Sequence, residues 1–221
     1  MKKIVIAFIL TLTLQSSQAQ LLQLQDPVSS KNFNPDKYAG IRGTPLFQDK
    51  WIHGSVITSK GIYSDLELKI DLYDNILFFN KEDASFELLD QIYSIKLFPK
   101  WPDTLQQLIF VKGMNQNGLK PEQYVQALVG TGAIQLYRSD IKQVTEMSEI
   151  NVGMIKTFAN TSRYYIKKGN ELKLIKLNKD EMMPFLIDKE AAVNAVIETK
   201  RLSLKKESDI IQVIQAYNNA P

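Results

Sequence analysis

The alternation of side chains between Leu66 and Tyr73 is the feature that most constrains the fold. Four aliphatic residues there alternate with polar or amphipathic ones: Leu66, Leu68, Ile70 and Leu72 with Glu67, Lys69, Asp71 and Tyr73. Strand side chains point to opposite faces with a period of two, so this pattern predicts a half-buried antiparallel strand whose aliphatic side chains face the core and whose polar side chains, including Asp71, face water. Asp74-Asn75 then interrupts the pattern before a second apolar run, 76–79, and the two runs predict a hairpin over residues 61–80. A shift of one residue would expose all four aliphatic side chains at roughly 1.5–3 kcal/mol each, so we expect a fixed register.

Other segments show weaker strand patterns. Short apolar or alternating runs predict strands within 51–58, 86–97 and 108–111, and hairpins over 124–144 and 163–177. Residues 146–160 follow neither period, so we predict a loop there.

Helical signals begin at Asn178. Asn178 followed by Glu181 fits a capping box, and Pro184 limits the first helix to one or two turns or kinks it. Asp188 is the predicted cap of the next helix and Ser203 of the last. Strands followed by helices predict class α+β: an antiparallel sheet or a partly open barrel made of hairpins, followed by two or three C-terminal helices.

The first 19 residues have the pattern of a cleavable signal peptide. Lys2 and Lys3 precede an apolar stretch that is too short to span a bilayer, and small residues precede a cleavage point after Ala19. We therefore expect a periplasmic or secreted protein that is not transmembrane after cleavage. The expected organisation is 1–19 signal peptide, 20–50 extended arm, 51–177 antiparallel β region and 178–221 helical region packed on the sheet, forming one globular domain.

Charge and cysteine content exclude several chemistries. The chain has 27 basic and 24 acidic residues, and loss of Lys2 and Lys3 leaves it nearly neutral, so we expect no nucleic-acid partner. It has no cysteine, which rules out disulfides, thiolate nucleophiles and cysteine-bound metals. No phosphate-binding glycine motif occurs, and we expect no cofactor.

Candidate site residues are few. His53 is the sole histidine, and its position in a strand beside Trp51 is more typical of a structural role than of catalysis. Asp71 and Asp74 are weak metal-ligand candidates because oxygen-rich sites bind calcium, but their spacing matches no EF-hand loop. Tyr63, Tyr73 and His53 are weak candidates for contacting a glycan or peptide ligand. We predict no catalytic residue.

Four segments together resemble a group of uncharacterised exported proteins of Bacteroidetes-type bacteria. They are the predicted signal peptide, residues 43–58 together with 61–79, residues 124–144, and residues 164–219, of which the last is the most specific. The resemblance covers most of the mature chain and implies an envelope location, with no known activity and no catalytic residues to transfer.

Three functional hypotheses follow. The first is a non-enzymatic binding or structural module, with an unknown envelope protein, glycan or lipid as partner. The second is a periplasmic carrier of a lipid or lipoprotein, which would need a half-open β-barrel with an apolar cavity. The third is a hydrolase that uses the acidic residues around Asp71 and Asp74, which would need converging carboxylates in a cleft. The oligomeric state stays open.

Overall fold

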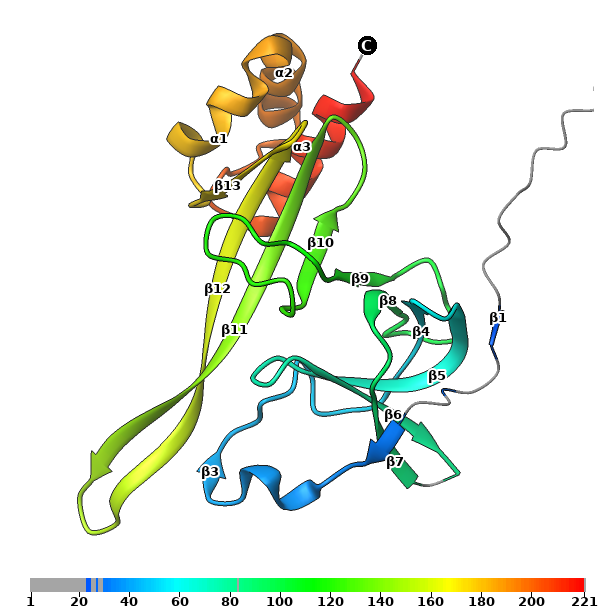
Figure 1. Ribbon diagram of the computed structural model, residues 1–221. Coiled ribbons are helices and arrows are strands. Elements are labelled where there is room, and N and C mark those ends of the chain that lie inside the picture. Colours follow the sequence, from blue (N-terminus) through cyan, green and yellow to red (C-terminus); the bar gives the residue numbers. More distant parts are fainter. Residues whose placement is uncertain (1–22, 25–26, 28–29, 83, 221) are drawn as a thin grey trace, which may run out of the picture.

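The computed structural model describes residues 23–24, 27, 30–82 and 84–220 (Figure 1). The predicted signal peptide lies outside these ranges. The strands are β1 (Gln23–Leu24), β2 (Ser30–Asn32), β3 (Ile41–Arg42), β4 (Ile52–Thr58), β5 (Ile62–Asp71), β6 (Ile76–Lys81), β7 (Ala84–Leu88), β8 (Ile92–Leu97), β9 (Leu108–Val111), β10 (Val125–Val129), β11 (Ile134–Glu149), β12 (Gly153–Lys168) and β13 (Glu171–Ile175). The helices are η1 (Pro35–Tyr38), α1 (Lys179–Leu186), η2 (Ile187–Lys189), α2 (Glu190–Lys200) and α3 (Glu207–Asn219).

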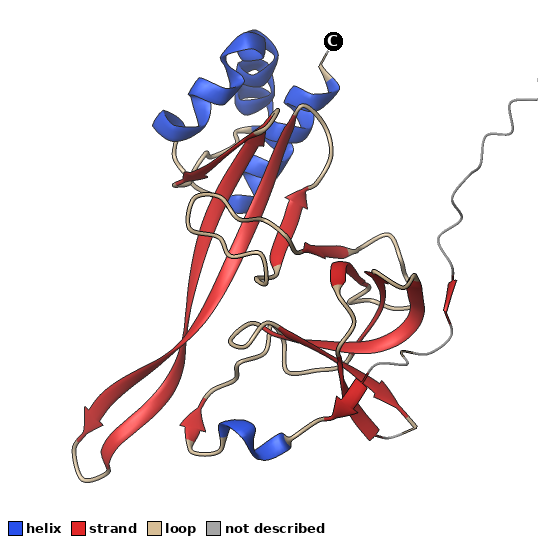
Figure 2. Cartoon of the chain, in the orientation of Figure 1, coloured by secondary structure: helices blue, strands red, loops and turns tan. Residues whose placement is uncertain are grey.

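The strands form one sheet that is dominated by antiparallel pairs and does not close. Its order is β13-β12-β11-β10-β9-β8-β4-β5-β6-β7-β2, with β1 parallel to β5 and β3 parallel to β12 off this path. The helices α1, α2 and α3 gather at the β10–β13 end, η1 lies beside β3, and the strands from β4 to β9 form the other half of the molecule (Figure 2). The predicted antiparallel sheet with C-terminal helices is confirmed in this form, as an open sheet.

The first core lies between the curved strands β4 to β9. The predicted hairpin is present: β5 pairs with β6, Leu68 lies opposite Phe79, and the aliphatic positions of β5 are buried in this core. Gly54 of β4 allows the close strand crossing, because a Cβ there would lie 2.5 Å from the carbonyl oxygen of Lys96.

The second core lies between the sheet and the helices. Leu136 and Ile166 contribute from the sheet, and the buried face of α3 contributes Ile210, Val213, Ile214 and Tyr217. A smaller third cluster, which includes Leu119, Tyr137 and Tyr165, covers the opposite face of β11 and β12. The end of the sheet near the helices is therefore packed on both faces.

One of the three predicted helix caps is present. The side chain of Asn178 accepts a hydrogen bond from the backbone N–H of Glu181 at 2.9 Å, so the cap of α1 is confirmed. The second bond of the predicted capping box is not formed, because the Glu181 carboxylate accepts the backbone N–H of Lys176 at 2.8 Å and not that of Asn178. The predictions for Asp188 and Ser203 are wrong, since α2 and α3 begin without a side-chain cap. Asp188 instead accepts hydrogen bonds from the Tyr217 hydroxyl and the Lys168 ammonium group.

The predicted loop at 146–160 is also wrong. Strand β11 continues to Glu149 and β12 begins at Gly153, so most of this segment belongs to a long two-stranded ribbon (Figure 1). Its far half has solvent on most sides, and an apolar–polar alternation does not develop where neither face is buried.

Candidate functional site

Two of the candidate ligand residues serve the fold. Tyr63 is fully buried, and its hydroxyl donates a hydrogen bond to Asp90 at 2.7 Å, so the ring has no surface for a ligand. His53 is half-buried and stacks on Trp101 at 5.0 Å between ring centres. Its Nδ1 lies 3.5 Å from a carboxylate oxygen of Asp65, which is longer than a good hydrogen bond.

Asp71, Asp74 and Tyr73 come together, under the N-terminal arm. The Tyr38 hydroxyl, at the end of η1, donates hydrogen bonds to Asp71 and, at 2.9 Å, to Asp74, and Lys37 pairs with Asp74 at 2.6 Å. The other oxygen of Asp71 accepts the backbone N–H groups of Tyr73 at 2.8 Å and Asp74 at 3.0 Å. Asp71 is fully buried, so the prediction that it lies on the wet face of the strand is wrong.

The proton balance of this cluster is set by burial. Burial raises the pKa of Asp71 above its ordinary value, although the hydrogen bonds from Tyr38 and the two backbone groups act in the opposite direction. Burial also raises the pKa of Asp74, but the hydrogen bonds from Lys37 and Tyr38 outweigh it and leave this pKa below the ordinary value. The Tyr38 hydroxyl has one proton, so at any moment it donates to one of the two carboxylates, Asp71 or Asp74.

The same cluster fastens the ribbon to the body. Tyr38, Tyr73 and Phe158 form a triangle of edge-to-face rings, with centres 5.3 to 5.9 Å apart. Phe158 belongs to β12, and it is buried although its neighbours along the ribbon are exposed or half-buried. These residues therefore explain how three distant segments are held together, and their contacts assign them a structural role.

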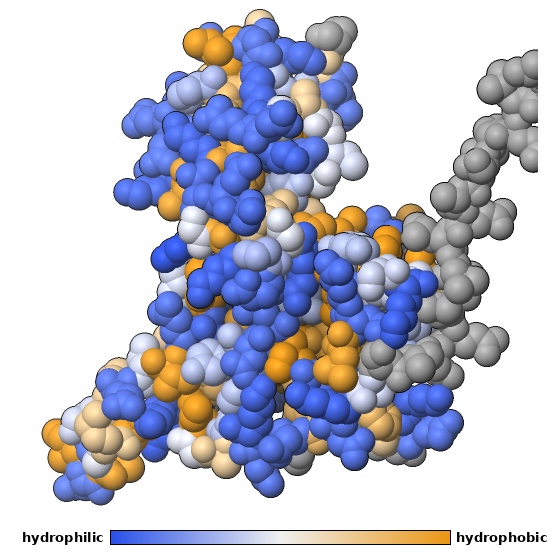
Figure 3. All heavy atoms as spheres, in the orientation of Figure 1, coloured by the Kyte–Doolittle hydropathy of each residue, from blue (hydrophilic) through white to orange (hydrophobic). Residues whose placement is uncertain are grey.

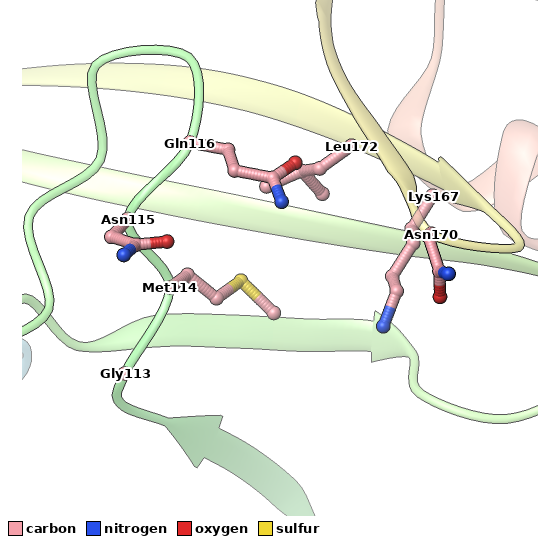
Figure 4. Close-up of a pocket in the computed structure, with 7 residues that line it drawn as sticks. All are labelled: Gly113, Met114, Asn115, Gln116, Lys167, Asn170 and Leu172. Atoms are coloured by element: carbon pink, nitrogen blue, oxygen red, sulfur yellow. The ribbon is translucent and has the colours of Figure 1, made fainter.

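Among the surface hollows of the described residues, four have volumes of about 310 to 530 Å³. The one in Figure 4 lies between the 113–116 loop and the β12–β13 hairpin, and its lining combines Met114 and Leu172 with the polar groups of Asn115, Gln116 and Lys167. The largest is lined by residues of β12, β13 and the start of α1, including Tyr164, Leu174 and Leu177. Neither Asp71 nor Asp74 lines any of these four hollows.

A metal site is not apparent in the described part of the chain. No three acidic or histidine side chains converge there, and the oxygens of Asp71 and Asp74 are taken up by Tyr38, Lys37 and backbone N–H groups. This pair is arranged to hold the arm.

The β11–β12 ribbon is the most distinctive surface feature. Its strands pair without a register shift from Ile134 opposite Lys168 to Glu149 opposite Gly153. Cross-strand pairs reinforce it, such as the 3.3 Å ion pair between Glu146 and Lys156. Beyond Phe158 the ribbon runs about five further residue steps, or roughly 17 Å, at the usual strand rise.

The end of the ribbon is apolar and exposed. We define the ribbon tip as Met147, Ile150, Val152 and Met154, whose exposed fractions are 69%, 88%, 59% and 66%. Met147 and Met154 project from opposite faces, because Met147 lies opposite Ile155 while Met154 lies opposite Ser148. Apolar colour marks this end of the molecule in Figure 3.

The sequence predictions missed the ribbon tip. A usable signal was the turn itself: Asn151 and Gly153 both adopt positive φ, and Asn and Gly are the residues that tolerate it. Apolar residues on both sides of an Asn-x-Gly turn indicate a hairpin. Because apolar and polar residues do not alternate in 146–160, the strand pattern did not predict this hairpin.

Comparison of the chain with protein-family models, with curated proteins and with solved structures finds no match. Among the helices of the described residues, none has both the length and the apolar character needed to cross a membrane. The function is therefore inferred from the chain's own geometry.

Proposed function

We propose that this chain is an exported, non-enzymatic binding module of the bacterial envelope that contacts its partner through the ribbon tip. Export would follow cleavage after Ala19, in keeping with the resemblance to exported Bacteroidetes-type proteins. The observation that carries the proposal is the tip itself: four exposed apolar side chains at the end of a long, regularly paired ribbon.

Exposed apolar groups of this kind are costly to keep in water and mark contact sites when they cluster. None of the four tip residues belongs to the three core clusters or packs against them, so the apolar character of the tip does not serve the core. Its side chains project from both faces and from the turn, which suits a partner that surrounds the end of the ribbon.

The other two hypotheses find less support. A carrier would need an apolar interior space, whereas the core clusters are filled and the hollows lie at the surface with mixed polar and apolar linings. A hydrolase would need carboxylates that face a cleft, and Asp71 and Asp74 face the arm instead. The binding module is therefore the function that the geometry supports best.

A photo-crosslinking residue at position 150, expressed in the native envelope, tests the proposal. Ile187 is a matched control position, since it is an isoleucine with an exposed fraction of 67% in the helical half. We expect one dominant crosslinked species from position 150 and none from position 187.

A competition variant sharpens the result. Replacing Ile150 and Met154 by serine should lower recovery of that species at least fivefold, because the tip loses its apolar contact, while Ile187→Ser leaves recovery unchanged. Equal recovery with both variants would show that the tip is not the contact, and the proposal would then be abandoned.

A further inference from the structure

The outer edge of β11 carries unpaired backbone groups along half of its length. Strand β10 pairs with β11 only as far as Arg138, and β12 occupies the other edge over the whole ribbon. From Ile141 to Met147, no described strand pairs with the outer edge. In Figure 1 this part of β11 borders the outside of the molecule, with β3 on the β12 side. An open strand edge of this length readily accepts another strand.

The side chains along this edge are complementary to themselves. A two-fold axis perpendicular to the ribbon makes two β11 strands antiparallel and keeps each face on its own side, so symmetric registers are centred on a residue. Centred on Val144, residue 142 lies opposite residue 146 of the other copy, and 141 lies opposite 147. Lys142 then meets Glu146 twice, and Ile141 meets Met147 twice, with Val144 opposite itself.

Registers centred on neighbouring residues bring less favourable side-chain pairs together. Centring on residue 143 places Asp140 opposite Glu146, which brings two negative charges together. Centring on residue 145 places Val144 opposite Glu146 and Ile141 opposite Glu149. A register centred on residue 142 places Lys142 opposite Lys142 of the other copy, and one centred on residue 146 places Glu146 opposite Glu146. Centring on residue 141 also opposes Asp140 to Lys142 and Ile141 to itself, but β10 covers the edge as far as Arg138, so only residues 139–143 could pair. Among the registers centred on residues 142 to 146, only the one through Val144 combines opposite charges on one face with apolar pairs on the other.

Two side chains gain a partner in this register. Lys142 makes no ion pair within the described part of one chain, and Met147 is 69% exposed. Pairing supplies Glu146 to Lys142, and Ile141 to Met147. Glu146 already contacts Lys156 at 3.3 Å and has a second oxygen for the new contact.

We propose that the protein self-associates as a two-fold dimer in which the Ile141–Met147 segments of two copies pair in antiparallel fashion about Val144. The result is a continuous four-stranded ribbon, β12-β11-β11-β12. The proposal goes beyond the binding function above, because it uses the backbone edge of β11, whereas that function uses the apolar side chains of the ribbon tip. Met147 is the one residue common to both surfaces.

Cysteine crosslinking tests the register, because the chain contains no cysteine of its own. With Val144→Cys, two directly opposed Cα atoms would be about 4.5–5.5 Å apart, within the range that a disulfide spans. With the control Gln143→Cys, the two cysteines would be diagonal neighbours about 7–8 Å apart, beyond easy reach. We expect mild oxidation to yield covalent dimer from the first variant and little from the second. Crosslinking that favours position 143 would overturn the register.

Charge reversal tests the pairing in solution, measured by sedimentation. Lys142→Glu and Glu146→Lys should each weaken dimerisation about tenfold or more, because each creates two like-charge pairs. An equimolar mixture of the two variants should recover wild-type affinity, because every charged pair in the mixed dimer is opposite again. The loss of the internal Lys156 contact in Glu146→Lys cannot produce that recovery.

Three results would overturn the proposal. They are a wild-type protein that is monomeric up to high micromolar concentration, a mixture of variants that stays monomeric, and a monomer that binds phosphatidylcholine vesicles through this edge. The last result would assign the edge to a lipid surface. Ile150→Ser combined with Met154→Ser leaves the Ile141–Met147 segment intact, so we expect it to lower tip binding at least fivefold without changing sedimentation. Failure of the dimer and failure of the proposed function are thus separable.

Discussion

At the scale of single residues, the chain uses polar groups to hold segments that are distant in sequence. Asp71 ends a strand whose pattern predicts a solvated carboxylate, yet Tyr38, 33 residues earlier, covers it. The contact between Tyr38 and Asp71 could not be predicted from the sequence, because local periodicity does not indicate which distant side chain covers the end of a strand. The clustering of Asp71, Tyr73 and Asp74 at one turn was within reach, whereas its structural role required Tyr38 and Phe158.

Asp71→Asn should change how stability depends on pH. The pKa of Asp71 is raised in the folded state, so the folded protein binds more protons than the unfolded chain between about pH 4 and that raised pKa. The wild type therefore loses stability from this group as the pH rises through the window. The unfolding free energy of the wild type minus that of Asp71→Asn should be largest near pH 4 and smaller at pH 7.

Urea denaturation at intervals between pH 4 and pH 7 measures this difference. Asp74 titrates in both proteins with an oppositely shifted pKa, so subtracting the two curves removes most of its contribution. A difference that grows with pH would show that Asp71 is stabilised as the anion, contrary to this prediction.

At the scale of elements, burial decides which strands a sequence pattern reveals. The alternation of β5 was readable because one of its faces enters the first core. The far half of β11 and β12 has no such face, so its strands are held by backbone pairing and by pairs such as Glu146 with Lys156. Asp188 failed as a predicted cap for a related reason, since Tyr217 and Lys168 take its oxygens.

Phe158→Ala should separate the ribbon from the body. The ring packs on Tyr38 and Tyr73, and its removal leaves a cavity at the only buried position of the far half of the described ribbon, so we expect a loss of about 3 kcal/mol in unfolding free energy. Ile150→Ala, at the exposed turn, should change it by less than about 0.5 kcal/mol.

Chemical denaturation measures both variants, and limited proteolysis locates the change. Cleavage within 145–157 should accelerate in Phe158→Ala and stay at the wild-type rate in Ile150→Ala. Equal stability of the two variants would mean that the aromatic triangle does not fasten the ribbon.

At the scale of the whole molecule, the two halves are joined by a continuous sheet, and the turn of the β5–β6 hairpin holds both ends of the 112–124 segment that leads from β9 to β10. Asn75 in that turn accepts hydrogen bonds from Lys112 at 3.2 Å and from the backbone N–H of Tyr124 at 3.3 Å. Because β8, β9 and β10 also pair in series, we regard the chain as one cooperative unit.

Two spectroscopic probes test this cooperativity. Both tryptophans, Trp51 and Trp101, lie in the β4–β9 half, while the three α-helices lie in the other half. Fluorescence and far-ultraviolet circular dichroism should therefore report coincident unfolding curves. Asn75→Ala should lower the midpoints of both curves together. The unfolding free energy should fall by about 1–2 kcal/mol, because the variant loses a hydrogen bond and places alanine at a φ of 57°.

Asn75→Gly is the matched control, since glycine tolerates that φ and lacks only the side-chain contact. The unfolding free energy of Asn75→Gly should lie between those of the wild type and Asn75→Ala. Helical signal that disappears before the fluorescence changes would contradict a single cooperative unit.

The unbroken register of the ribbon also has a mechanical consequence. Sixteen consecutive pairs leave no bulge at which the two strands can slip, so a load applied at Ile150 cannot be absorbed by a change of pairing. Phe158, which packs on Tyr38 and Tyr73, is the point between the two ends at which the ribbon is held to the body. At the end of the ribbon near the helices, the Arg138 guanidinium donates two hydrogen bonds, of 2.8 and 2.9 Å, to the carboxylate of Glu207 in α3. Pulling on the far end therefore becomes torque on a helix, and the ribbon is a lever that carries force into the helical half.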